Sequence, residues 1–344
     1  MLSNFQSDMA RETHETPSAV GRLVERRMQG LLKVGQRIAG LAPPLVATCA
    51  RGSSDHAAAY FKYMLEIATG TPVVSIGPSI ASVYEAPLRL SGIPLVTISQ
   101  SGQSPDLLAL QASAKASGAL TIAVVNTEDS PVARAADIVI PLEAGPERSV
   151  AATKSFVASA VAVAGIAAGW TNDAHLIRAL HALPETLDDA LRVDWSALIP
   201  TLVQRDSLYV VGRGPSFPIA QEAALKSKET AALHAEAFSL AEVMHGPLAL
   251  VQGGFPVLAL LPEDRAALAG RKTVERLAAA GGNVFSAAVK PAQGTSLPVA
   301  PTGHSTLDPL SMILSFYCLI EQVCRERGHD PDQPVNLRKI TETV

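Results

Sequence analysis

Cysteine is scarce in this chain, and its spacing fits neither a disulfide framework nor a metal site. The three cysteines, Cys49, Cys318 and Cys324, all lie in apolar segments. Such usage is typical of a reducing compartment. His234 and Glu236 have the H-x-E spacing of a zinc deaminase, but no Cys-x-x-Cys pair follows them. The sequence therefore predicts no metal site and no cofactor.

Charge is also sparse and nearly balanced. Charged residues make up 17% of the chain and the formal net charge is −4, which argues against nucleic-acid binding through phosphate neutralisation. Residues 155–170 are almost uncharged, but this run is shorter than the roughly 20 residues that span a bilayer, so we expect a buried helix there. The first twenty residues include Asp8, Arg11, Glu12 and Glu15 and have no apolar core, so we expect no signal peptide. These features predict a cytoplasmic protein with no membrane partner.

Hydrophobic residues, in contrast, are abundant. They make up 48% of the 344 residues, enough for two domains with separate cores. Short runs rich in Val and Ile alternate with helical patterns, which predicts an α/β fold of parallel sheets covered by helices on both faces. In the first half we expect strands at 45–50, 73–76, 93–98, 120–125 and 137–141, and helices at 1–34, 55–69 and 153–191.

The second half of the chain repeats the first. Arg213-Gly214 follows an apolar run as Arg51-Gly52 does, and the run at 255–260 matches the run at 93–98, both 162 residues apart. The run at 283–286 matches the strand near residue 121 in the same register. One register across three strands predicts two copies of one α/β unit. The expected organisation is a helical arm (1–34), a first unit (35–192), a second unit (193–330) and a C-terminal tail (331–344).

A polar loop follows the third expected strand and precedes a helical pattern. Its sequence is Ser99-Gln100-Ser101-Gly102-Gln103-Ser104. In a strand–loop–helix of this kind, free backbone N–H groups and the positive helix end face an anion. The Ser and Gln side chains add neutral donors, and each hydrogen bond to a charged group is worth about 1.5–3 kcal/mol. The alternative is an ordinary serine-rich N-cap turn.

The repeat favours the anion site over the N-cap turn. At the matching position the second copy has Leu261-Pro262-Glu263-Asp264-Arg265-Ala266. A proline and two carboxylates make a poor anion site. Because only the first copy carries the hydroxyl groups and the glycine, we expect that copy to bind a phosphate.

Further motifs occur in the order and at the spacing of a known family. They are Gly52-Ser53-Ser54, Ser99-Gln100-Ser101-Gly102, Val150-Ala151-Ala152-Thr153-Lys154, Gly212-Arg213-Gly214, the run from Glu222 to Glu229, His234-Ala235-Glu236-Ala237, the run 245–250 and the run 332–339. From about residue 35 to its end, the chain resembles a double SIS (sugar isomerase) protein, and in particular the isomerase half of glucosamine-6-phosphate synthase. This resemblance implies two tandem flavodoxin-like three-layer units that act on a hexose 6-phosphate.

The resemblance also implies roles for individual residues. Glu229 matches the base that moves a proton between C1 and C2, His245 the ring-opening residue supplied by a neighbouring subunit, and Lys339 the tail lysine that forms a Schiff base with the open-chain ketose. A shared site of this kind implies a homodimer. The residues implied in binding the phosphate and the sugar are Gly52, Ser53, Ser54, Ser99, Gln100, Ser101, Ser104, Ala151, Ala152, Thr153 and Glu222.

The chemistry of these residues supports the implied roles but leaves alternatives open. A partly desolvated carboxylate can shuttle protons, yet Glu229 could instead pair with Lys226 or Lys228 on a solvated helix face. His245 precedes a Gly-Pro turn, and an unperturbed pKa near 6.5 suits proton transfer; the alternative is capping of the next element. A Schiff-base lysine needs a pKa below about 10.4, and Lys339 without the resemblance would be taken as a surface lysine.

Four positions depart from the synthase pattern. Arg51 stands where the synthase has Cys, Ser53 and Ser104 replace Thr, and Ala152 replaces a Ser that touches substrate. The sequence also shows no glutaminase domain with its N-terminal catalytic cysteine. We therefore expect the reverse direction, conversion of glucosamine 6-phosphate to fructose 6-phosphate and ammonia. The alternatives are deglycation of a fructosamine 6-phosphate, an isomerase or deaminase of another sugar phosphate such as the galactose-series amino sugar, and a non-catalytic phosphosugar sensor.

Overall fold

The computed structural model describes residues 7–337 and residue 339. These residues form two compact units that interleave along the chain. The first unit contains residues 18–147 and 154–181 and residue 339, and the second unit contains residues 7–17, 148–153 and 182–337. The domain boundaries predicted at 35, 193 and 331 follow the repeat in the sequence and stay a prediction.

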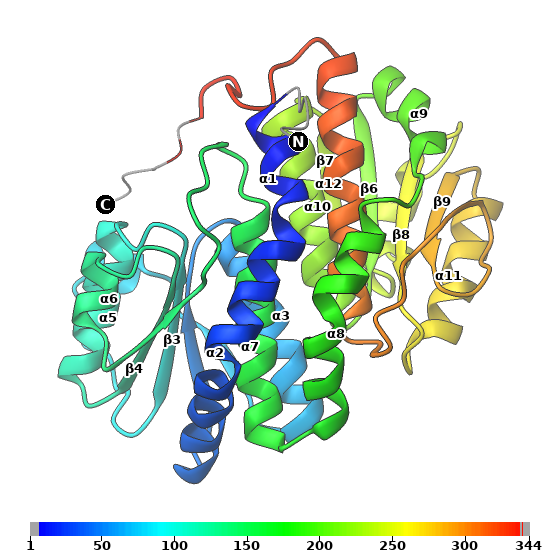
Figure 1. Cartoon of the computed structure of the whole chain (residues 1–344). Coiled ribbons are helices and arrows are strands. Elements are labelled where there is room, and N and C mark those ends of the chain that lie inside the picture. The colour runs from blue at the N-terminus through cyan, green and yellow to red at the C-terminus, as the bar shows by residue number, and fades with distance from the viewer. Residues whose placement is uncertain (1–6, 338, 340–344) are drawn as a thin grey trace. The chain divides into compact units, whose positions relative to one another are not determined.

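The first unit is a three-layer α/β sandwich around a parallel sheet (Figure 1). In spatial order its strands are β2 (Val73–Ser75), β1 (Val46–Cys49), β3 (Pro94–Ser99), β4 (Leu120–Val125) and β5 (Ile138–Pro141). Apolar side chains of β1, β3 and β4 pack against α5 (Pro105–Ala116) and α6 (Pro131–Ala135) on one face. On the other side lie α2 (Thr16–Gly40), α3 (Ser53–Thr69) and α7 (Lys154–Thr171), and α4 (Ser79–Ser82) is a short helix after β2.

The helices α2 and α7 cross closely. A Cβ atom added to Gly35 would lie 2.1 Å from the Ile166 carbonyl oxygen, and one added to Gly169 would lie 2.3 Å from that of Leu32, so the approach requires glycine. Among the described residues, α7 is the one helix long and apolar enough to cross a membrane, and 89% of its apolar window is buried inside the protein. The buried helix predicted at 155–170 is confirmed.

The second unit has a sheet of the same topology. Its strands are, in spatial order, β10 (Thr295–Leu297), β9 (Asn283–Ala288), β8 (Pro256–Leu261), β6 (Ser207–Gly212) and β7 (His234–Ser239). Its helices are α1 (Asp8–His14), the end of α8 (Ala174–Ala190), α9 (Ile199–Gln204), α10 (Ser216–Ala231), α11 (Ala267–Ala279) and α12 (Asp308–Glu326), with 3-10 turns η1 (Ser196–Leu198), η2 (Glu242–Met244) and η3 (Pro247–Leu250). Because β3 and β8 begin at Pro94 and Pro256, the offset of 162 residues holds in the structure. The predicted pair of tandem α/β units is confirmed.

Local details differ from the sequence prediction. The single helical section expected at 153–191 is two helices, because Asn172 has a positive φ of 51° and ends α7. The arm expected at 1–34 is also two helices, and the second runs on to Gly40. Strand β7 was not predicted. It lies at a sheet edge with His234 and Glu236 exposed, and so it has no continuous apolar run.

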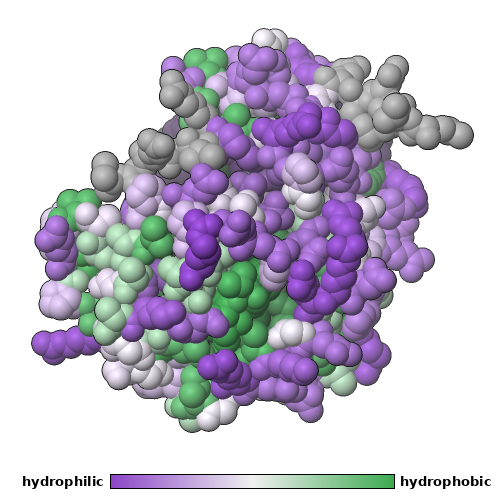
Figure 2. Space-filling model, turned by 60° about the vertical axis from the view of Figure 1, so that its left-hand side comes forward, coloured by the Kyte–Doolittle hydropathy of each residue, from purple (hydrophilic) through white to green (hydrophobic). Residues whose placement is uncertain are grey.

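Hydrophobic surface is gathered in a few areas among hydrophilic side chains (Figure 2). In the first unit an apolar groove runs between α2 and the edge strand β5, where Val139 is 38% exposed. A second group of exposed apolar side chains follows β2 and includes Ile80, Val83 and Tyr84.

Candidate active site

The loop at 99–104 joins the end of β3 to the start of α5. The Ser99 hydroxyl, at the end of β3, accepts a hydrogen bond from the Gly102 N–H at 3.0 Å. Ser104 is the N-cap residue of α5, but its side chain makes no capping bond. Gly102 has a φ of 61°, and a Cβ atom there would lie 2.1 Å from the Ser130 hydroxyl. The loop therefore needs glycine at this position, as a close backbone approach requires.

A second loop lies beside it, because β1 pairs directly with β3. Gly52 follows β1 with a φ of 53° and is the N-cap residue of α3, and Ser53 and Ser54 form the first turn of that helix. Two helix N-termini thus adjoin neighbouring strand ends of one parallel sheet. This is the arrangement in which phosphates bind by backbone N–H groups and hydroxyls. The structure brings together all seven residues predicted at these two loops within the first unit.

An ion pair connects the two loops. The Nε and Nη2 atoms of Arg51 donate to the Oδ2 atom of Asp106 at 3.0 and 2.8 Å. The Asp106 side chain is fully buried in the first turn of α5, whereas the Arg51 side chain is 51% exposed. Arg51 stood out in the sequence as a departure from the synthase pattern, but its partner was missed.

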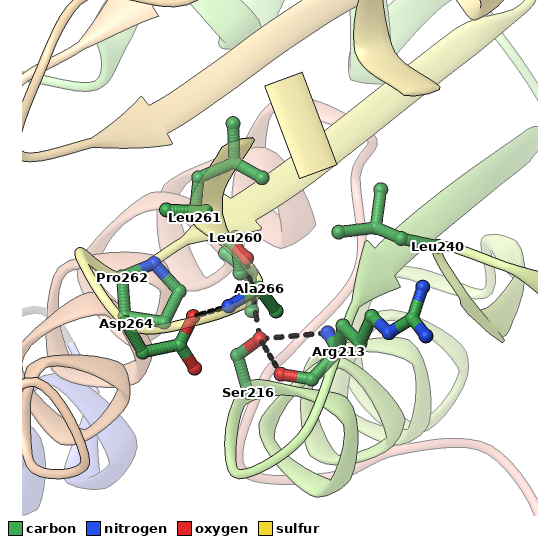
Figure 3. A pocket seen from close by; sticks show the side chains of 9 residues that line it. Arg213, Ser216, Leu240, Leu260, Leu261, Pro262, Asp264 and Ala266 are labelled. Carbon is green, nitrogen blue, oxygen red and sulfur yellow. Dashed lines mark hydrogen bonds between the residues drawn. The ribbon is translucent and has the colours of Figure 1, made fainter. Parts of the chain in front are cut away.

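The matching loops of the second unit enclose a small pocket (Figure 3). The Ser216 hydroxyl accepts from the Arg213 N–H at 2.9 Å and lies within 3.2 Å of the Arg213 and Leu260 carbonyl oxygens. The Asp264 carboxylate accepts from the Ala266 N–H at 2.8 Å. Burial is the main cause of a raised pKa for Asp264. In this unit a carboxylate of the protein itself lies at the helix start, where an anion would otherwise bind.

Helix α10 carries a buried charge cluster in the second unit. The Lys226 ammonium forms a very short ion pair with Glu229 and lies 3.4 Å from the Glu222 carboxylate, which also accepts from the Tyr317 hydroxyl at 3.1 Å. Lys226 is 1% exposed and Glu229 23% exposed. Burial opposes the charge on Lys226, but the carboxylates of Glu222 and Glu229 outweigh it and raise its pKa. Lys228 instead donates to the Ala235 carbonyl oxygen.

Glu229 therefore pairs with Lys226, as one alternative foresaw, but Lys226 is buried and the face is not solvated. Lys226 itself was missed as a site residue, although its spacing signalled it. A lysine four residues after Glu222 and three before Glu229 lies on the same helix face as both. The fully buried carboxylate of Glu222 is engaged by Lys226 and Tyr317, and its predicted sugar contact stays a prediction.

The other predicted residues of the second unit lie in irregular segments. His245 is exposed between η2 and η3. Ala151 and Thr153 are buried and Ala152 is half-buried in the segment 148–153. The roles of these four residues stay predictions. That residues of both units form one site also stays a prediction.

Lys339 contacts a buried carboxylate of the first unit. Its ammonium lies 3.3 Å from the Glu147 Oε2 atom, and the Glu147 side chain is fully buried. The same carboxylate accepts from the Ser155 N–H at 3.0 Å and from the Ser155 hydroxyl at 2.5 Å. The remainder of the tail at 338 and 340–344 lies outside the described residues. Sequence reasoning missed Glu147, for which the only signal was its position next to the motif at 150–154.

Known proteins share this architecture. The SIS domain family matches residues 46–167 and 201–286, one segment in each repeat. Glutamine–fructose-6-phosphate aminotransferase (isomerizing) of Bradyrhizobium diazoefficiens is 34% identical over 98% of this chain and 59% of its own length. The chain thus spans about three fifths of that relative.

Solved structures extend the similarity. The crystal structure of a proposed phosphosugar isomerase of Silicibacter pomeroyi DSS-3 is 45% identical with a TM-score of 0.90, covering 95% of this chain and all of the other. The glucosamine-6-phosphate deaminase of Thermotoga maritima has the same fold, with a TM-score of 0.80 at 20% identity over 98% of this chain and 100% of the deaminase. The chain belongs to the SIS domain family, with one matching segment in each of its two units.

Proposed function

We propose that this protein is an isomerising deaminase that converts glucosamine 6-phosphate to fructose 6-phosphate and ammonia. The observation that carries the proposal is the α10 cluster, in which Glu229 is partly open while its partner Lys226 is fully buried. The ion pair with the buried Lys226 holds the Glu229 carboxylate in place, and the Glu229 side chain is still 23% exposed. This is what a base needs if it is to reach two adjacent carbons of one substrate.

The reaction can be written with these residues. The first-unit loops hold the phosphate, and Glu229 removes the C2 proton of the open-chain aldose and returns it to C1. A proton also passes from the C2 amino group to O1, so the aldehyde becomes a hydroxyl group and C2 carries an imine. Lys339 then attacks C2, expels ammonia and forms a Schiff base, and water hydrolyses this to the ketose and the free lysine. The buried Glu147 carboxylate, 3.3 Å from the Lys339 ammonium, supplies a local acceptor for the proton that the lysine must lose before it attacks.

The comparisons support this direction of reaction. The Thermotoga maritima deaminase is covered over its whole length by the fold of this chain. A protein named glucosamine-6-phosphate deaminase therefore has two units of this fold and no further domain in its solved chain. Glutamine-dependent synthesis would also need a site that releases ammonia from glutamine. We assign no such site to the described residues of this chain.

The test is direct. Purified protein is incubated with glucosamine 6-phosphate, and ammonia and fructose 6-phosphate are measured together. Glu229→Gln should lower kcat by about a thousandfold with little change in binding, whereas the control Glu236→Gln, at an exposed position on β7, should leave kcat unchanged. A panel with galactosamine 6-phosphate, fructosamine 6-phosphates and neutral hexose phosphates identifies another substrate if the first is inert. Binding without turnover of any of them would indicate a sensor and refute the proposal.

We also propose a homodimer with a shared site. His245 is exposed on a loop, and the family resemblance assigns its role to the site of a neighbouring subunit. His245→Ala and Lys339→Ala should each be inactive alone. An equimolar mixture that has exchanged subunits should regain about a quarter of the activity, because half of its dimers are mixed and one of the two sites in a mixed dimer has both residues. Failure of complementation in a proven mixed dimer would place His245 in its own subunit's site.

A further inference from the structure

Glu12, a buried carboxylate of the N-terminal arm, has no role in the reaction proposed above. Glu12, in the middle of α1, has a fully buried side chain. Its Oε1 atom accepts from the Arg148 N–H at 2.5 Å, and its Oε2 atom accepts from the Ser149 N–H at 3.1 Å. A buried carboxylate is unfavourable unless charge-assisted hydrogen bonds satisfy it. Glu12 therefore fixes the backbone at the start of the segment 148–153.

That segment has no helix or strand of its own. Its conformation therefore depends on contacts such as those of Glu12, which lies 136 and 137 residues away along the chain. The segment contains Ala151, Ala152 and Thr153, which are expected to contact the sugar. It also follows directly on Glu147, whose carboxylate contacts Lys339.

Helix α1 is itself anchored at its first turn. The Asp332 carboxylate accepts from the Asp8 N–H at 2.6 Å and the Met9 N–H at 2.9 Å. The Ser7 hydroxyl donates to Glu321 of α12 at 2.7 Å. Asp332 belongs to the tail that continues to Lys339. One short helix thus connects the tail segment before the lysine to the segment expected to contact the sugar.

We propose that Glu12 is a positioning residue of the active site, which holds the segment 148–153 in the conformation that receives the sugar. Asp332 supports it by holding α1. The kinetic test of this role rests on the proposed function. Hydrogen exchange tests the same role without any turnover of substrate. It gives the N-terminal arm a part in the reaction although no residue of α1 is among those expected to contact the substrate.

The test compares Glu12→Gln with Glu15→Gln. Glutamine keeps the shape but turns an NH₂ group toward a backbone N–H, whereas Glu15, at the end of the same helix, is 43% exposed and pairs with Arg11. In Glu12→Gln, amide exchange across 148–153 should accelerate by about tenfold or more, and kcat/KM should fall by about tenfold. Inorganic phosphate, which needs only the first-unit loops, should bind within about twofold of wild type. Glu15→Gln should match the wild type in all three.

Asp332→Asn should act in the same direction but more weakly, and should slow borohydride trapping of fructose 6-phosphate on Lys339. Unchanged exchange at 148–153 in Glu12→Gln overturns the proposal, as does faster exchange with unchanged kcat and KM, which would make Glu12 merely structural. If the wild type turns over no sugar phosphate, protection of 148–153 by fructose 6-phosphate decides instead. Protection in the wild type that is lost in Glu12→Gln supports the role of Glu12, and equal protection or none refutes it.

Discussion

The loop after β3 and the loop after β8 start at equivalent strand positions, 162 residues apart, and differ in chemistry. The first has serines, glutamines and a glycine and no carboxylate of its own between residues 99 and 104. In the second, Asp264 accepts the Ala266 N–H at the start of the following helix. A helix start attracts negative charge. The second unit places Asp264 in the loop itself. In the first unit the carboxylate at the helix start is Asp106, which pairs with Arg51, and we propose that the loop before it binds a ligand phosphate.

The preceding loops differ in a similar way. In the first unit the Arg51 guanidinium pairs with the buried Asp106 and so joins the two loops at which we expect the phosphate. In the second unit Arg213, at the equivalent position, lines a pocket whose Ser216 hydroxyl is engaged by the backbone of Arg213 and Leu260. The two units have the same sheet topology, and the side chains at these strand ends support the proposal that the first unit binds the phosphate.

The largest expected effect comes from giving the first loop the carboxylate of the second. Ser101 corresponds to Glu263 in the repeat, and Ser101→Glu would place a negative charge where we expect the phosphate. Loss of a charged hydrogen bond, worth about 1.5–3 kcal/mol, together with repulsion should weaken phosphate binding by about a hundredfold or more. Titration calorimetry with inorganic phosphate and fructose 6-phosphate measures it. Glu263→Gln is the control and should not change affinity; equal losses in both variants would contradict the assignment of the site.

A second comparison concerns two glycines with the same φ angle. Gly102 and Gly214 both have a φ of 61°, but a Cβ atom would lie 2.1 Å from Ser130 at Gly102, whereas at Gly214 the nearest atom is 3.9 Å away. Gly214→Ala should therefore lower the free energy of unfolding by about 1–2 kcal/mol through backbone strain, and Gly102→Ala by a further ~1–3 kcal/mol through overpacking. Urea unfolding measures both, and only Gly102→Ala should also weaken phosphate binding. Equal destabilisation would show that Ser130 moves aside without cost.

A smaller effect is expected at the Arg51–Asp106 ion pair. Arg51→Gln removes a cation from the edge of the phosphate loops and the connection between them, so KM for the sugar phosphate should rise by about fivefold. Arg213→Gln, at the matching position of the second unit, should leave KM unchanged. Steady-state kinetics and phosphate titration distinguish the two units, and an identical change in both variants would contradict a special role for Arg51.

The fold was predictable because its signals are local and repeated. Apolar runs and a constant offset of 162 residues were enough for the central strands β1, β3, β4, β6, β8 and β9. The edge strands β2 and β5 were also predicted, because each contains a short apolar run. The edge strands β7 and β10 were missed because polar residues occupy their exposed positions, as at His234 and Glu236. The division of the 153–191 section into α7 and α8 depends on one residue, Asn172, in the left-handed region.

In the candidate site, too, local features were predictable from the sequence and long-range contacts were not. The 99–104 loop is a local strand–loop–helix, and this arrangement was predicted from the sequence. The spacing of Glu222, Lys226 and Glu229 places the three residues on one face of α10, but Lys226 was not predicted as a site residue. The contact between Lys339 and Glu147 joins residues 192 positions apart, and no period or propensity encodes such a pair. Long-range contacts of single buried carboxylates had to come from the structure.

The smallest expected effect separates the charge of Asp264 from its hydrogen bond. Burial raises the pKa of Asp264 above its ordinary 3.8, so its ionised form is less favourable in the folded protein than in the unfolded chain. Its contribution to stability is thus greatest at low pH and declines as the pH rises through 3.8 toward the raised folded value. Asp264→Asn keeps an oxygen for the Ala266 N–H and removes the charge. Its melting temperature should exceed that of the wild type by under about 2 °C at pH 7, with no difference near pH 3.

Phosphate affinity should not appear in the second unit of this variant, because Pro262 and Glu263 remain. Appearance of a second phosphate site would mean that one carboxylate alone separates the two units.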